Sequence, residues 1–130
     1  MEIYITTDLA FVEGVYRFNA VYAFKSKTSV KSYEKYLASS GEDHKLIVTP
    51  CTVPDETTTF NVIIEFEVID DLPKYKSTII IEDYDDARDY VENIKETQPA
   101  IKVNHATVKI RSRFSPDFLH CGWAYLDLSC

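Results

Sequence analysis

The chain has 130 residues, 45% of them hydrophobic and 27% charged, a balance typical of one globular domain and not of a disordered chain. Its net charge of −7 argues against nonspecific binding to nucleic acid, which needs clustered Lys and Arg. Three cysteines are too few, and odd in number, for a disulfide framework, so a reducing cytoplasm is the expected setting.

The first half of the chain is expected to form three strands and one helix, because apolar residues alternate in three runs and recur with helical spacing in another. The expected elements are, in order, a strand at Met1–Thr6, a loop or single helical turn at residues 8–14, a strand at Val15–Lys25, a helix at Ser29–Ala38 and a strand at Lys45–Thr49 that Pro50 ends. Val30, Tyr33 and Leu37 form the apolar stripe of the helix.

The strand at Val15–Lys25 carries aromatic residues at alternate positions. Its even positions are Tyr16, Phe18, Ala20, Tyr22 and Phe24. We expect these positions to share one face of the sheet. We favour a core role for this face, because a stacking platform for bases would be interleaved with basic residues. Tyr22 and Phe24 remain candidates for the wall of a ligand pocket.

The strongest strand signal is Phe60–Ile69, in which β-branched and aromatic residues alternate. We expect Phe66 to point into the core, and Glu65 and Glu67 to fall on the other face. The elements that follow are, in order, a turn at residues 70–74, a strand at Tyr75–Ile81, a helix that begins after the N-cap Asp83 and ends before Pro99, a strand at Ala100–Phe114 and a strand at Gly122–Leu128. Apolar positions change from odd to even along residues 100–114, which predicts a bulge near Asn104 and His105.

These elements predict an α+β fold in a single domain over residues 1–130. The expected architecture is one twisted, mainly antiparallel sheet of six or seven strands, with two helices packed on one face. Residues Phe24–Val48 and Ile81–Val103 each run strand, helix, strand over similar lengths, which is a weak indication of an internal repeat. The two segments share no convincing residue identity.

No catalytic, cofactor or metal-binding motif stands out in this sequence. The three glycines build neither a dinucleotide-binding fingerprint nor a phosphate-binding loop, and the histidines stand at no zinc-type spacing. A calcium-loop-like start at Asp83 fails, because the positions that need Gly and Glu hold other residues. The remaining enzymatic hypothesis is a Cys–His pair that uses Cys51 or Cys121, for example Cys51 with His105. Because no catalytic, cofactor or metal-binding motif stands out, we expect no enzymatic activity, no cofactor and no metal.

The helix after Asp83 has the most informative charge pattern. At about 100° per residue, four of its acidic residues fall within about 60° of one another, opposite the apolar positions. These residues are Asp85, Asp89, Glu92 and Glu96. Such a face is common on a solvent-exposed helix, and Arg88 is placed to pair with Glu92 at i+4. The alternative is a rigid row of negative charges that resembles a phosphate backbone to a basic partner.

The acidity extends beyond this helix. Residues 54–100 carry thirteen acids and four bases, whereas the segments on either side are neutral or weakly basic. Asp70 and Asp71, in the preceding turn, join the candidate partner-binding residues. The leading hypothesis is therefore a binding protein without enzymatic activity, whose acidic segment docks a basic, nucleic-acid-binding surface of another protein. Small acidic inhibitors encoded by phages and mobile elements act in this style. Direct nucleic-acid binding and membrane association are not expected.

A basic face lies on the strand at residues 100–114. Its residues are Lys109, Arg111 and Arg113. We favour a structural role in which Glu65 and Glu67 pair with them across neighbouring strands. The alternative function is a small-molecule-binding domain, in which these three residues, Tyr22 and Phe24 line a pocket for an anionic ligand such as a nucleotide.

Overall fold

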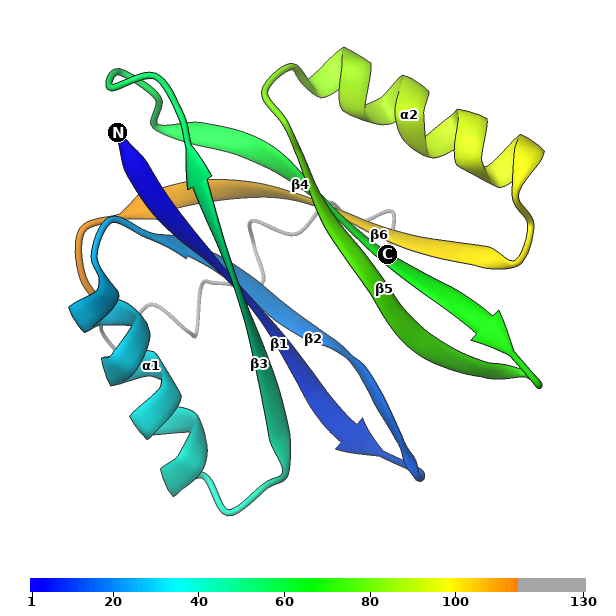
Figure 1. Ribbon diagram of the computed structural model, residues 1–130, viewed down its shortest axis with the longest axis horizontal. Helices are drawn as coiled ribbons and strands as arrows, with labels where there is room; N and C mark the ends of the chain where they lie inside the picture. The colour runs from blue at the N-terminus through cyan, green and yellow to red at the C-terminus, as the bar shows by residue number, and fades with distance from the viewer. Residues whose placement is uncertain (115–130) are drawn as a thin grey trace.

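The computed structural model describes residues 1–114, which fold into six strands and two helices (Figure 1). In chain order the elements are β1 (Glu2–Val12), β2 (Val15–Phe24), α1 (Lys27–Ser39), β3 (His44–Thr52), β4 (Thr59–Ile69), β5 (Leu72–Ile81), α2 (Tyr84–Thr97) and β6 (Ile101–Arg111). The α+β fold is therefore confirmed. The strand predicted at Gly122–Leu128 lies outside the described residues.

The six strands form one sheet in the order β3-β1-β2-β6-β4-β5. Neighbouring strands are antiparallel except β2 and β6, which run parallel and pair only through Ala23 with Ile110 and Phe24 with Arg111. The backbone N–H of Lys25 extends this short junction by donating to the carbonyl of Arg111 at 3.0 Å. The sheet is therefore mixed, and the prediction of a mainly antiparallel sheet is confirmed only in part.

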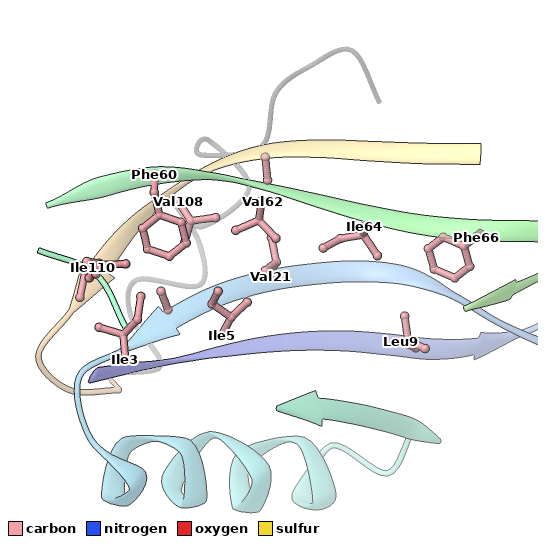
Figure 2. Close-up of a cluster of buried hydrophobic side chains, with 13 residues drawn as sticks. Ile3, Ile5, Leu9, Val21, Phe60, Val62, Ile64, Phe66, Val108 and Ile110 are labelled. Carbon is pink, nitrogen blue, oxygen red and sulfur yellow. The ribbon is translucent and has the colours of Figure 1, made fainter. Parts of the chain in front are cut away.

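The main hydrophobic core lies between two three-stranded layers of the sheet, because the sheet folds over at the β2–β6 junction (Figure 2). We call the side of each strand that faces this core the inner face. Its buried residues come mainly from β1, β2, β4 and β6, and Phe66 is one of them, 3% exposed. The prediction that Phe66 points into the core is confirmed.

The two helices cover the outer face of the folded sheet. Tyr33 and Leu37 of α1 pack against Tyr22 and Phe24 of β2. The buried residues of α2 pack instead against Ile63 and its neighbours in the other layer. The prediction of two helices on one face is thus confirmed only in part: each helix covers its own layer, and they lie on opposite sides of the molecule (Figure 1).

The architecture repeats along the chain. β1 begins at residue 2 and β4 at residue 59, and a shift of 57 residues also carries β2 onto β5 and the first residues of α1 and β3 onto those of α2 and β6. The strand orders β3-β1-β2 and β6-β4-β5 are equivalent. We call residues 1–57 the first repeat and residues 58–114 the second. Only Tyr33/Tyr90 and Lys45/Lys102 are identical at this spacing.

Backbone hydrogen bonds repeat with the same spacing. The bond from the N–H of Phe11 to the carbonyl of Asp43 has its counterpart between Val68 and Ala100, at 3.0 and 2.8 Å. Each hairpin also has a register shift at the equivalent place, after Asp8 in β1 and after Glu65 in β4. The two repeats therefore share their backbone design although their sequences have almost nothing in common.

β1 and β3 are longer than the sequence predicted. Residues 8–14 are not a loop, because β1 continues to Val12 and turns into β2 through Glu13 and Gly14, both with positive φ. Pro50 does not end β3, which runs on to Thr52. A proline is tolerated there because β3 is an edge strand, where one backbone N–H is not needed for pairing.

The aromatic residues of β2 do not share one face. The register shift leaves Asn19 unpaired as a bulge, which moves Tyr16 and Phe18 to the inner core, whereas Tyr22 and Phe24 lie under α1. In β6 the predicted bulge is absent, because its pairing with β4 runs without interruption. The apolar residues there change sides because α2 covers one face and the inner core contacts the other.

Candidate functional site

The acidic face of α2 is formed as the sequence predicted. The Asp83 side chain caps the helix by accepting a hydrogen bond from the N–H of Asp86 at 3.1 Å. Ala87, Val91 and Ile94 face inward, which turns the opposite side of the helix toward solvent. The side chains exposed there are Asp85, Asp89, Glu92 and Glu96. All four carboxylates are therefore accessible from solvent.

Few bases neutralise this face. Arg88 pairs with Asp85 at 3.7 Å and not with Glu92 as the i+4 spacing had indicated. Within residues 1–114, Asp89, Glu92 and Glu96 form no ion pair. The negative charge of α2 is therefore directed to solvent.

Asp70 and Asp71 occupy the turn between β4 and β5. Both have positive φ, 54° and 65°, a backbone that Asp tolerates better than most residues. The adjacent strand end is tied to the loop after α2, since Val68 donates to the carbonyl of Ala100 at 2.8 Å. Both residues of this turn are exposed, so their carboxylates face solvent.

The first repeat supplies an internal comparison for α2. The positions of α1 that correspond to Asp85, Asp89, Glu92 and Glu96 hold Thr28, Ser32, Lys35 and Ser39. All four are exposed on a helix that packs in the equivalent way. The acidity of α2 is therefore not a requirement of this architecture.

The residues of the predicted alternative ligand site are only partly available. Lys109 and Arg113 are exposed, but Tyr22 and Phe24 are buried beneath α1, 6% and 0% exposed. Burial raises the pKa of Tyr22 to about 12, against the opposing effect of the nearby charge of Arg111. The two rings therefore pack as core residues and do not form an exposed platform.

The predicted pairing of the basic strand with Glu65 and Glu67 is wrong. In the β4–β6 register, Glu65 lies opposite Val103 and Glu67 opposite Ile101, whereas Lys109 lies opposite Thr59. The prediction failed because it assumed a different alignment of the two strands. Arg111 instead extends past the end of β4, beside Phe24 of β2.

Cys51 and His105 are not brought together. Cys51 packs against the inner core from β3, whereas His105 lies on the outer side of β6, against the ring of Tyr84. Burial and then the negative charge of Glu82 raise the pKa of the Cys51 thiol, which disfavours the nucleophilic thiolate. Cys121 lies outside the described residues.

Two buried carboxylates were missed by the sequence analysis. Asp8 is fully buried; it accepts a hydrogen bond from the amide of Asn19 at 2.7 Å and contacts Nδ1 of His44 at 2.8 Å. Its counterpart in the second repeat, Glu65, lies on the face opposite Phe66 as predicted, but it is only 3% exposed, and this burial was not foreseen. Both repeats place an acid at the same position, next to a bulge. Comparing the sequence with itself at a spacing of 57 residues reveals this pair of acids.

Glu65 is satisfied by two hydroxyl groups. It accepts hydrogen bonds from Ser77 at 2.6 Å and from Tyr90 of α2 at 2.7 Å. Tyr90 is one of the two residues that are identical in the repeats, and its counterpart Tyr33 lies close enough to Asp8 for that charge to raise the pKa of its hydroxyl, after the larger effect of burial. The helix tyrosine and the buried acid thus form a recurring pair.

Stability at alkaline pH should depend on Tyr90. Burial, followed by the bond to Glu65, raises its pKa from 10.0 to about 12. Because the folded-state pKa is the higher one, Tyr90 contributes stability that is complete below pH 10.0 and is lost as pH rises to about 12. The stability difference between wild type and Tyr90→Phe, measured by urea denaturation, should therefore shrink between about pH 9 and about pH 12. An unchanged difference would contradict this.

Neither a cluster of metal-binding side chains nor a helix that could span a membrane is present among the described residues. Within residues 1–114, His, Cys, Asp and Glu side chains do not gather in the groups of three or more that a metal ion needs. Neither α1 nor α2 has the length and apolar composition that crossing a membrane requires.

Comparison of the chain with protein-family models, with curated proteins and with solved structures finds no match. Its function is therefore inferred from its own surface chemistry.

Proposed function

We propose that the protein is a binding module without enzymatic activity, which docks the acidic face of α2 onto a basic surface of another protein. The observation that carries this proposal is the contrast between the two repeats. At equivalent helix positions the first repeat exposes Thr28, Ser32, Lys35 and Ser39, and the second exposes four carboxylates. Since the fold does not require this acidity, a role in recognition accounts for it.

The basic partner is one whose surface normally holds nucleic acid. The acidic residues lie along one side of a 14-residue helix, which at about 1.5 Å per residue gives a rigid row comparable in spacing to backbone phosphates. Asp70 and Asp71, exposed in the β4–β5 turn, are further candidate contacts for the basic partner. Opposite fields of this kind accelerate association and set specificity more than they raise affinity.

Reversing two charges on α2 tests the proposal. Asp89→Lys with Glu92→Lys should leave stability within about 0.5 kcal/mol of wild type, because both side chains are exposed. The double variant should no longer capture the protein that the wild type binds in extracts of its native host. Its rate of association with that protein should fall about tenfold or more at low salt. Nucleic acid should compete with the wild-type interaction.

A matched control shows whether binding depends on where the reversed charges lie or only on the change in net charge. Glu34→Lys with Glu56→Lys changes the net charge by the same four units but lies in the first repeat, on exposed positions. This variant should bind like the wild type. If both double variants capture the partner equally well, or if association rates do not depend on salt, the acidic face of α2 is not the docking surface.

A further inference from the structure

The β1–β2 and β4–β5 turns lie at the same end of the folded sheet (Figure 1). Residues from the strand ends next to these turns line two pockets. The β2–β6 pocket, about 290 Å³, lies where β2 and β6 separate beyond their short parallel junction. Its lining includes Arg17, Lys102, Phe18 and Phe66. Two cations and two aromatic residues of the core thus line the same pocket.

The second pocket, which we call the β3–β5 pocket, has a volume of about 260 Å³. Its lining includes Lys45, Lys74, Leu9 and Tyr75. Pro73 contributes to both pockets, so the two are neighbours. The two openings therefore share part of their lining.

The two pockets are counterparts in the repeat. The 57-residue spacing relates Arg17 to Lys74, Phe18 to Tyr75, Leu9 to Phe66 and Lys45 to Lys102. The last pair is one of only two identities between the repeats. The other, Tyr33/Tyr90, is accounted for by the buried acids. A lysine retained at equivalent places in two otherwise dissimilar repeats points to a shared role.

The two lysines occupy an unusual place in the sheet. Lys45 lies directly opposite Leu9, and Lys102 directly opposite Phe66. Residues that are opposite in neighbouring strands share a face, and Leu9 and Phe66 belong to the buried inner core. Both lysines are thus on the inner face, where the core opens to solvent. An apolar side chain is the usual choice at such a position.

The pocket cations are not used by the fold. Arg17, Lys45, Lys74 and Lys102 are exposed, and they form no ion pair within residues 1–114 of a chain with 21 acidic residues. Glu67 lies opposite Lys74 in the register but does not pair with it. Asp43 is an acid near the β3–β5 pocket, but it does not pair with the pocket lysines. Its two carboxylate oxygens accept hydrogen bonds from the hydroxyl group of Tyr16, at 3.0 and 3.1 Å.

We propose that the twin pockets bind a small molecule that carries two phosphate groups, one held by Arg17 and Lys102 and the other by Lys45 and Lys74. A phosphate monoester has about 1.5 to 2 negative charges at pH 7, which matches the two cations of each pocket. A carboxylate would leave one of them unneutralised. Pro73 and the aromatic residues of the lining provide an apolar floor for the organic part of the ligand. The site is separate from the acidic face of α2 and does not rest on the function proposed above.

Isothermal titration calorimetry with two nucleotides tests this. Adenosine 3′,5′-bisphosphate and adenosine 5′-monophosphate differ by one phosphate, so the bisphosphate should bind wild-type protein about tenfold or more tighter, because it gains a second set of charge-assisted hydrogen bonds. Equal affinities, or no binding of either nucleotide, would overturn the proposal. This comparison needs no variant and is independent of any folding defect.

Lysine variants locate the site. Lys45→Met and Lys102→Met keep the aliphatic stem, and each should weaken bisphosphate binding about tenfold or more. Lys25→Met is the matched control, since Lys25 is exposed next to the other end of β2, and it should bind like the wild type. If Lys25→Met weakens binding as much as the pocket variants, the attraction is diffuse and the pockets are not the site. Circular dichroism confirms that each variant is folded.

Discussion

Replacing Phe66 with alanine should lower the free energy of unfolding by about 3–5 kcal/mol. The side chain is 3% exposed in the inner core and meets the ring of Tyr75 edge to face, with centroids 6.1 Å apart. Replacing the ring with a methyl group reduces the buried apolar surface and leaves a cavity between the two layers. Because strand pairing fixes the backbone of each layer, the neighbouring side chains can fill this cavity only in part. Urea denaturation followed by circular dichroism measures the loss.

Phe11→Ala is the matched control, because it removes the same atoms from a surface position. Phe11 is 47% exposed near the β1–β2 turn and contacts mainly the ring of Tyr16, at 5.1 Å. Its loss should cost less than about 1 kcal/mol. A cost below about 1 kcal/mol for Phe66→Ala as well would mean that the inner core is not the main source of stability.

The elements with a regular pattern were predictable from the sequence. β4 is Thr59–Ile69, within one residue of the run identified by alternation, and α2 begins after the predicted cap Asp83. In both, the local signal agrees with the final environment: Phe66 and its even-numbered neighbours face the inner core, and the apolar stripe of α2 faces the sheet. The acidic face follows directly from that stripe, because it lies on the opposite side of the helix.

The parts that were missed depend on contacts between distant residues. β1 seemed to end at Thr6 because Thr7 and Asp8 interrupt the apolar alternation. Asp8 is nevertheless buried, since Asn19 and His44 from the two flanking strands satisfy its carboxylate. No local pattern carries that information. The same reason applies to Glu65, whose burial depends on Tyr90 of α2, a residue distant in the sequence.

The basic pockets were also beyond the reach of local patterns. Arg17 and Lys102 are far apart in the sequence and line the same pocket only because β2 and β6 are joined at one end and diverge at the other. Lys45 and Lys102 become a recognisable pair only when the repeat is known. With two identical residues between the repeats, composition and periodicity indicated a similar layout but could not align the two segments.

The repeats have kept one design and diverged in how they complete it. Each places a buried acid on its central strand, β1 or β4, next to a bulge. In the second repeat two hydroxyl groups satisfy Glu65. In the first, Asp8 is shorter and is satisfied by Asn19 of β2 and His44 of β3. Asp8 therefore links the three strands of its layer through hydrogen bonds, and its removal should destabilise the whole layer.

Asp8→Ala should accordingly cost about 3 kcal/mol or more in the free energy of unfolding, because it removes two hydrogen bonds to a fully buried carboxylate, at about 1.5–3 kcal/mol each. Asp8→Asn keeps the shape of the side chain and part of the bonding, so its cost should be smaller. The control is Asp55→Ala: Asp55 also has a short ion pair, 2.7 Å to the N-terminal ammonium, but its side chain is 89% exposed, so solvent screens the pair and its loss should cost much less than the loss of Asp8. Urea denaturation at neutral pH ranks the three variants. If Asp8→Ala costs no more than Asp55→Ala, the buried carboxylate does not hold its three strands together.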